Sequence, residues 1–194
     1  AKKALPDSKV RHQPTHCVQI APDDLPRFAK LDVAAEFSPQ FMFAPGFLVS
    51  MTRTLGRASV EAMYPARDVL DAGGVVAIGS DYAVTPLDPW SKIQWLVRHQ
   101  HPDHPTMEVL APNRRLSVAE AIRAYTFGGA YAIGRDHEVG TIEVGKYAEF
   151  IVLDQNLFDH EKAKRTDLIG KPRPTKTIFE GETVFDVGAD NPKP

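Results

Sequence analysis

A short apolar run, Val75–Ile78, constrains the fold of this chain more than any other stretch. Glycines border it at Gly73, Gly74 and Gly79, and such a run is typical of a strand buried on both faces of a sheet. Asp81 follows directly, where α/β barrels place their chemistry, at the carboxyl end of a parallel strand. An aspartate that caps a helix or forms a turn would show the same local pattern, which leaves both readings open.

Strand and helix signals alternate before this run. The sequence predicts a strand over 13–20 with His16 near its end, a helix that begins at 21–24, and a strand over 33–37. A short helix over 64–73 then leads into the apolar run. This alternation with short connections predicts a parallel α/β arrangement. Between these elements lies a Phe- and Met-rich stretch without a clean period, either a long active-site loop with short helical pieces or packed core.

The remaining chain changes character part of the way along. A helix is expected over 89–98, and the capping box formed by Ser117 and Glu120 opens another that runs to about Thr126. From Gly140 on, alternating apolar and polar residues predict β-structure. The expected elements there are a hairpin over 141–146, a strand over 150–154, a polar connector over 155–172 and a second hairpin over 176–187.

Length and composition restrict the class of protein. The 194 residues carry a net charge of −2, which gives no reason to expect nucleic acid as a partner, and no run approaches the 18 or so apolar residues that a membrane span needs. The only cysteine, Cys17, cannot form an internal disulfide and fits a reducing cytoplasm. A (β/α)8 barrel needs about 250 residues, so the strands belong either to a small open sheet or to the last portion of something larger.

Four segments in fixed order resemble the C-terminal part of the amidohydrolase superfamily, and most closely the amidohydrolase family 3 group of metal-dependent hydrolases. The resemblance covers about residues 10–187, and its segments are YPARDVLDAG (64–73), GSDYAVTPLDPW (79–90), LSVAEAIRAYTFGGAYAIG (116–134) and GTIEVGKYAEFIVLD (140–154). It implies an α/β fold: the C-terminal part of a (β/α)8 TIM-like barrel over 10–135, strands of a small flanking β-sandwich over 136–187, and a disordered tail over 188–194.

The resemblance also implies a site. Asp81 matches the aspartate that ends the eighth barrel strand, binds metal and accepts a proton from the attacking water, and His16 matches a metal-ligand histidine of the sixth strand. Thr15 stands where close relatives often have Glu. The implied activity is hydrolysis of a C–N bond in a small amide or cyclic amide by metal-activated water, with a divalent metal, zinc by expectation, as cofactor.

The same resemblance implies an incomplete site. The family takes further ligands from a His-x-His on the first strand and from middle strands, which would precede Ala1. A catalytic zinc site takes three protein ligands, whereas His16 and Asp81 supply two. We therefore expect an inactive chain by itself, completed by the N-terminal remainder of the barrel or by a homo-oligomer. The alternative is a non-catalytic α/β binding or assembly domain that keeps the scaffold and covers its open sheet edges by association.

Other residues of interest have simpler interpretations. His16 itself could be a hydrogen-bonded core residue. The pair His99 and His101 imitates a metal-binding spacing but follows a helix, which favours surface histidines. Cys17 is expected to be a packed thiol, and Asp88 a turn former before Pro89. Tyr82 lies near enough to Asp81 in sequence to reach a substrate, but no motif supports that role.

Overall fold

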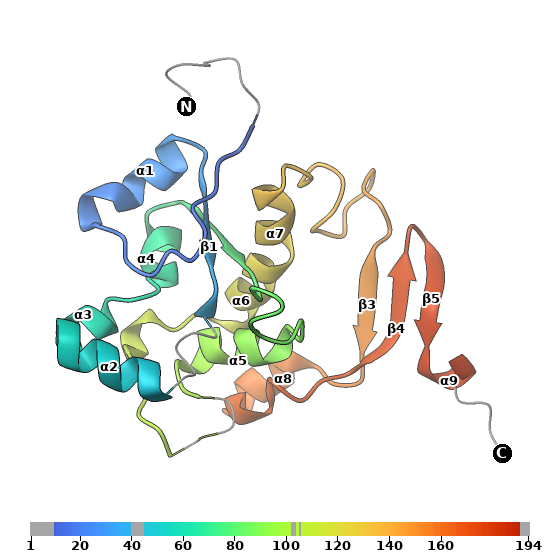
Figure 1. Ribbon diagram of the computed structural model, residues 1–194. Helices are drawn as coiled ribbons and strands as arrows, with labels where there is room; N and C mark the ends of the chain where they lie inside the picture. Colours follow the sequence, from blue (N-terminus) through green and yellow to red (C-terminus); the bar gives the residue numbers. More distant parts are fainter. Residues whose placement is uncertain (1–9, 40–44, 102–103, 105, 191–194) are drawn as a thin grey trace.

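The computed structural model describes residues 10–39, 45–101, 104 and 106–190 (Figure 1). Two sheets organise them: a parallel pair, β1 (Ala34–Phe37) and β2 (Val75–Ile78), and an antiparallel sheet of three strands in the order β3-β4-β5. Helices surround the first sheet, whereas the second lies at the other end of the molecule (Figure 1).

Both strands of the parallel pair were expected from the sequence, and both faces of that pair are covered. Neighbouring residues on β2, Val76 and Ala77, point to opposite faces, yet each is 2% exposed. Ala77 packs with Ala34 and with Ala132 of helix α7 (Phe127–Ala132), whereas Val76 belongs to the main core together with Val69 of helix α4 (Ala66–Asp71). The run that opened the sequence analysis is therefore a strand buried on both faces.

The strand predicted over 13–20 does not form. Residues 10–16 instead run alongside β1 as an extended segment, with one parallel bridge between His12 and Val33. Backbone hydrogen bonds from Ala34 N to His12 O (3.1 Å) and from Glu36 N to Pro14 O (3.2 Å) hold it there. Pro14 has no N–H to donate in return, which interrupts the ladder. The segment over 10–16 therefore lies beside β1 as the sequence order predicts, but it is only partly paired and does not form a strand.

The helices follow most of the expected capping signals. Ser117 caps α6 by accepting from Glu120 N, and the Glu120 carboxylate accepts from Ser117 N, which is the predicted capping box. The stretch without a clean period holds a helix pair, α2 and α3, and residues 40–44 of it lie outside the described residues. The helices and 3-10 turns up to α7 are η1 (Pro22–Asp24), α1 (Leu25–Lys30), α2 (Pro45–Leu55), α3 (Arg57–Glu61), α4 (Ala66–Asp71), α5 (Trp90–Arg98), η3 (Pro112–Arg114), α6 (Val118–Tyr125) and α7 (Phe127–Ala132).

Two predictions for the C-terminal part were wrong. The hairpin expected over 141–146 is a turn without strands, centred on Gly145 in the left-handed region (φ 93°). The expected polar connector contains helix α8 (Leu157–Lys162) and the 3-10 turn η4 (Thr166–Leu168). Leu157 and Ile169 explain the second error: both are buried in the main core, so this segment packs against that core.

The antiparallel sheet matches the other predictions for this part. Its strands are β3 (Phe150–Leu153), β4 (Pro174–Phe179) and β5 (Glu182–Asp186), and a tight turn at Glu180 and Gly181 joins the last two. A short helix, α9 (Val187–Asp190), takes up the first part of the tail predicted over 188–194, and residues 191–194 lie outside the described residues. Phe150, Ile151 and Val152 of β3 are exposed, whereas Leu153 at the end of the strand packs against the main core.

Candidate metal and proton-transfer site

The carboxyl edge of the parallel strands brings together side chains from three separate segments. The extended segment ends at His16, β1 carries Glu36 and is followed by Ser38, and β2 is followed by Asp81. Because parallel strands end at the same edge, residues that are distant in sequence become neighbours there. The distance between His16 Nε2 and Asp81 Oδ2 is 3.9 Å. The structure therefore places the two residues singled out in the sequence next to each other.

His16 is held by contacts on its backbone and on its ring. It has a left-handed backbone (φ 55°), and the next residue, Cys17, still donates its backbone N–H to Glu36 O of β1 at 2.9 Å. Its backbone N donates to Glu36 Oε2 at 2.8 Å, and its ring Nδ1 lies 2.8 Å from Ser38 Oγ. The opposite ring nitrogen faces Asp81. The alternative interpretation, a histidine hydrogen-bonded within the core, fits the Nδ1 side of the ring, which contacts Ser38. It does not fit the whole side chain, because 36% of that side chain is exposed.

Asp81 projects from a loop that is tied to the helix behind it. The Thr85 hydroxyl donates to Ser80 O at 2.5 Å, and Lys92 of α5 donates its ammonium protons to Pro86 O and Asp88 O at 2.5 and 2.7 Å. Lys92 is 1% exposed, and burial lowers the pKa of its amino group. The Asp81 side chain is 32% exposed and has a left-handed backbone (φ 50°). Hydrogen bonds thus fix the loop that carries Asp81, and its carboxylate is partly exposed.

Three residues of this region escaped the sequence analysis: Glu36, Ser38 and Lys92. Glu36 carried a signal, since it is the one charged residue within the apolar strand Ala34–Phe37, and its side chain is 12% exposed. Ser38 is buried beside it and donates to Glu36 Oε1 at 3.0 Å. Lys92 carried no comparable signal, because a lysine on an amphipathic helix is ordinarily solvated.

The donor pair fits part of a metal site. Zinc bonds to histidine nitrogen and carboxylate oxygen at about 2.0–2.2 Å, so one ion can contact both atoms when they are less than about 4.2 Å apart. The separation of 3.9 Å between His16 Nε2 and Asp81 Oδ2 meets that condition. Across the described residues, however, no group of three or more His, Cys, Asp or Glu side chains is arranged to hold an ion. The pair fits two positions of a site that needs further ligands.

The other histidines and the cysteine do not belong to this site. The prediction that His99 is a surface histidine was wrong: it is 3% exposed, stacks on Trp95 at a centroid distance of 4.5 Å, and its Nδ1 lies 3.0 Å from Leu110 O. Burial lowers the pKa of His99 to about 4, so the ring is neutral near pH 7. Cys17 is buried as expected, and burial raises the pKa of its thiol to about 11, which leaves it protonated and inert.

Asp88 and Tyr82 stay outside the His16–Asp81 pair. The Asp88 carboxylate accepts from Ser91 N at 3.2 Å, at the start of α5, in agreement with the turn role expected for it. Tyr82 is 70% exposed.

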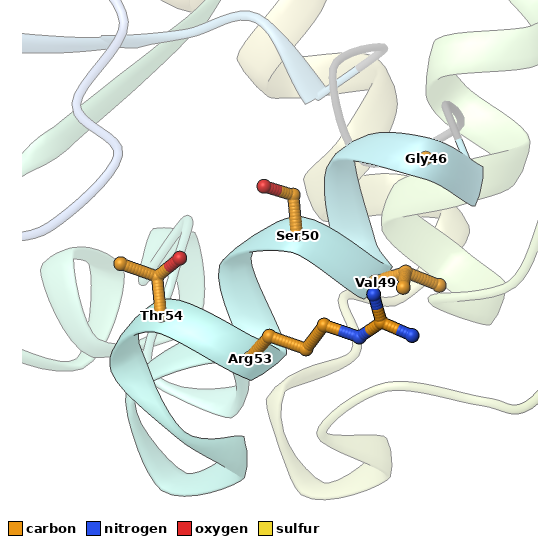
Figure 2. Close-up of a pocket in the computed structure, with 5 residues that line it drawn as sticks. All are labelled: Gly46, Val49, Ser50, Arg53 and Thr54. Carbon is orange, nitrogen blue, oxygen red and sulfur yellow. The ribbon is translucent and has the colours of Figure 1, made fainter.

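A hollow of about 480 Å³ beside α2 is also separate from this edge (Figure 2). Its lining residues, Gly46, Val49, Ser50, Arg53 and Thr54, share one face of that helix. They include no carboxylate, imidazole or thiol that could bind zinc or accept a proton, so we assign it no chemistry.

In the part of the chain that the structure describes, none of the helices has the length and apolar character of a membrane span.

Parallel strands with polar side chains gathered at their carboxyl edge define an α/β protein, and in α/β folds that edge is the usual place for a ligand. Comparison with known proteins makes the assignment specific. The sequence model described as "Amidohydrolase family" matches residues 1–185. The chain therefore belongs to the amidohydrolase family.

Individual relatives agree with this assignment. The chain is 29% identical over 156 residues to Protein LONG AFTER FAR-RED 3 of Arabidopsis thaliana, covering 79% of this chain and 26% of that protein. It is 33% identical over 135 residues to N-substituted formamide deformylase of Arthrobacter pascens, covering 69% and 24%. The chain thus spans about a quarter of the length of these curated relatives.

A solved structure supports the fold. The zinc-bound crystal structure of an adenosine deaminase from Xanthomonas campestris superposes with a TM-score of 0.62 at 20% identity, covering 90% of this chain and 37% of that one. At this identity the similarity establishes a shared fold and nothing finer.

Proposed function

We propose that this chain supplies His16 and Asp81 to the active site of a metal-dependent enzyme that hydrolyses a C–N bond in a small amide or cyclic amide. The observation that carries the proposal is the 3.9 Å separation of His16 Nε2 and Asp81 Oδ2 at the carboxyl edge of the parallel strands. Membership of the amidohydrolase family and the similarity to an N-substituted formamide deformylase support the substrate class.

Each residue has a separate role in this proposal. His16 would hold the ion through Nε2, and Asp81 would hold it through one carboxylate oxygen. A divalent metal, zinc in our proposal, supplies Lewis acidity that polarises a carbonyl and makes water more acidic. Asp81 also accepts the proton that the attacking water releases, for which its half-exposed position gives access to both water and substrate.

The proposal includes further polypeptide. Two ligands leave at least one protein ligand of a catalytic zinc site to be supplied from elsewhere. We propose the N-terminal remainder of a (β/α)8 barrel as the source, with a second copy of the chain as the alternative, and we expect residues 10–187 alone to be inactive. The exposed apolar faces of β3, β4 and β5 support the same view, because a completed β-sandwich over 136–187 would cover them.

One observation favours a second candidate, a non-catalytic binding or assembly domain. The described residues hold no complete metal-ligand group, while their antiparallel sheet exposes apolar side chains on both faces. A domain that functions by association needs only the second feature. For either candidate we propose a cytoplasmic protein, supported by the unpaired Cys17, with a small-molecule substrate or a protein partner rather than nucleic acid or membrane.

Metal analysis and hydrolysis assays test the proposal. The 194-residue chain and the protein expressed from the entire reading frame are compared for bound zinc and for turnover of N-substituted formamides and cyclic amides. We expect substoichiometric zinc and no turnover in the chain alone, and stoichiometric zinc with turnover in the entire protein. There, Asp81→Asn lowers kcat by about 10²–10⁴-fold, and His16→Asn lowers zinc content.

His137→Asn is the matched control, since its side chain is 72% exposed and away from Asp81. An entire protein that neither binds zinc nor turns over any C–N substrate would favour the non-catalytic domain. Stoichiometric zinc in the chain alone would contradict the requirement for further ligands.

A further inference from the structure

We propose that Glu36 and Ser38 are positioning residues that set the tautomer of His16 and thereby aim its metal-binding nitrogen at Asp81. This inference rests on the proposed function, because it assigns the arrangement a purpose at the same site. Neither residue touches a substrate or an ion in the proposal. They act only through His16.

The contacts form a closed ring of three residues. Glu36 Oε2 accepts from His16 N at 2.8 Å, Glu36 Oε1 accepts from Ser38 Oγ at 3.0 Å, and Ser38 Oγ lies 2.8 Å from His16 Nδ1. Glu36 and Ser38 are largely withdrawn from water, at 12% side-chain exposure and 1% exposure. Water therefore has little access to replace any of these contacts.

The direction of each proton follows from chemistry. A carboxylate has no proton to donate, so the Ser38 hydroxyl must donate to Glu36 Oε1. A hydroxyl has a single proton, and Ser38 Oγ can meet His16 Nδ1 only as an acceptor. The imidazole therefore carries its proton on Nδ1 and its lone pair on Nε2. Nε2 is the atom 3.9 Å from Asp81 Oδ2, so the ring presents a metal-binding lone pair toward the aspartate.

A glycine makes room for the carboxylate. A Cβ built at Gly79, directly after β2, would overlap Glu36 Oε1 and approach Ser38 Oγ to 3.8 Å. Gly79 has no positive φ, so its backbone alone does not require glycine. The space in front of Gly79 is occupied by the Glu36 carboxylate, which connects the end of β2 to the ring of contacts around His16.

Conversion of Glu36 to glutamine should invert the tautomer. In Glu36→Gln, the amide oxygen can still accept from His16 N, but the amide nitrogen then faces Ser38 Oγ and donates to it. The Ser38 hydroxyl is released to donate to His16 Nδ1, which leaves the ring proton on Nε2. A residue that merely stabilised the fold would have no such effect, because the substitution keeps size and shape.

Nitrogen NMR of the metal-free chain measures this directly. Long-range proton–nitrogen spectra of the imidazole rings, recorded at about pH 8.5, well above the ordinary histidine pKa of about 6.5, distinguish the two tautomers. His16→Asn identifies the His16 signals. We expect an Nδ1–H ring in the wild type, an Nε2–H ring in Glu36→Gln, and a mixture in Ser38→Ala. Glu143→Gln, a substitution of an exposed carboxylate, should leave the wild-type pattern.

A wild-type ring with its proton on Nε2, or a pattern unchanged in both Glu36→Gln and Ser38→Ala, would overturn the inference. If Glu36→Gln does not fold, Ser38→Ala decides alone, since it removes only a hydroxyl. The measurement needs neither metal nor substrate, so a failed assignment of zinc or amide hydrolysis leaves it intact. Addition of Zn²⁺ gives a second readout: the His16 Nε2 signal should shift in the wild type and in Glu143→Gln, and shift less in Glu36→Gln.

Discussion

The two sheets of this molecule contain similar apolar residues in opposite surroundings. In the parallel pair, Phe37 is fully buried and Val76 is 2% exposed, whereas Phe179 and Val184 in the antiparallel sheet are 53% and 60% exposed. The first sheet gains its stability from the helices of its own chain. The second is held by its ladder and its turn, and many of its apolar side chains stay exposed among the described residues. The comparison shows that apolar patterning specifies a strand without specifying what the strand packs against.

The largest expected effect compares two phenylalanines. Phe37→Ala empties a site in the main core and should lower the free energy of unfolding by about 3–5 kcal/mol. Phe179→Ala removes a half-exposed ring and should cost at most about 1 kcal/mol. Urea unfolding followed by circular dichroism measures both. Equal losses in the two variants would mean that the antiparallel sheet is covered in solution, which would end the contrast between the sheets.

A pair of neighbouring glycines on α7 sharpens the same comparison. A Cβ at Gly128 would overlap the backbone oxygen of Val76, so Gly128→Ala should push α7 away from β2 and cost about 1–3 kcal/mol. Nothing lies within 4 Å of a Cβ at Gly129, where alanine should stabilise the helix by about 0.5–1 kcal/mol. The melting temperatures of the two variants should therefore move in opposite directions. Shifts of the same sign would contradict the close approach of helix and strand.

A helix cap gives a smaller effect on the covered side. Ser117→Ala removes the acceptor for Glu120 N at the start of α6, a helix that packs on β2, and should cost about 1 kcal/mol. Thr166 offers a control in Thr166→Ala, because it is the first residue of the 3-10 turn η4 and not its N-cap, which is Arg165. Thermal unfolding of the two variants would test the difference. An unchanged melting temperature for Ser117→Ala would show that packing, and not the cap, sets the start of α6.

The smallest expected effect is on the free energy of unfolding at acid pH. Arg67 donates to Glu120 Oε2 at 2.5 Å and holds the pKa of that carboxyl at about 2. A lowered folded-state pKa contributes stability that is complete above the unfolded value, about 4.5, and is lost as the pH falls toward 2. The carboxylate is 35% exposed, so solvent screening keeps the contribution below about 1 kcal/mol. Glu120→Gln should flatten the dependence of unfolding free energy on pH in this window, and an unchanged slope would contradict it.

Much of the fold could be predicted because its signals are local. The capping box at Ser117, the apolar strand over 75–78 and the turn at Glu180 and Gly181 each specify their own backbone, and the structure confirms them. The predictions that failed depended on tertiary packing. His99 is buried because Trp95 and Leu110 enclose it, and the segment over 155–172 is helical because Leu157 and Ile169 reach the main core.

Some residues of the candidate site could likewise be predicted from the sequence, and others could not. Asp81 and His16 were found from their positions near strand ends, and the structure brings them to 3.9 Å, while their roles as ligands and proton acceptor remain predictions. Glu36 and Ser38 were missed: a glutamate within an apolar strand signals that the position is unusual, but its partners Ser38 and His16 are known only from the structure. Gly79, the residue that makes room for the Glu36 carboxylate, was noted only as the end of an apolar run.

The sequence by itself determined the family, the α/β class and the two residues at the carboxyl edge, because those features depend on residue type and order along the chain. Only the tertiary structure decided which groups surround His16, which histidine is buried, and which sheet remains uncovered. The physical reason is that hydrogen-bond direction and burial depend on which side chains the fold brings together, as the contact between His16 and Glu36, 20 residues apart, illustrates. Such neighbours are set by packing, which local patterns do not record.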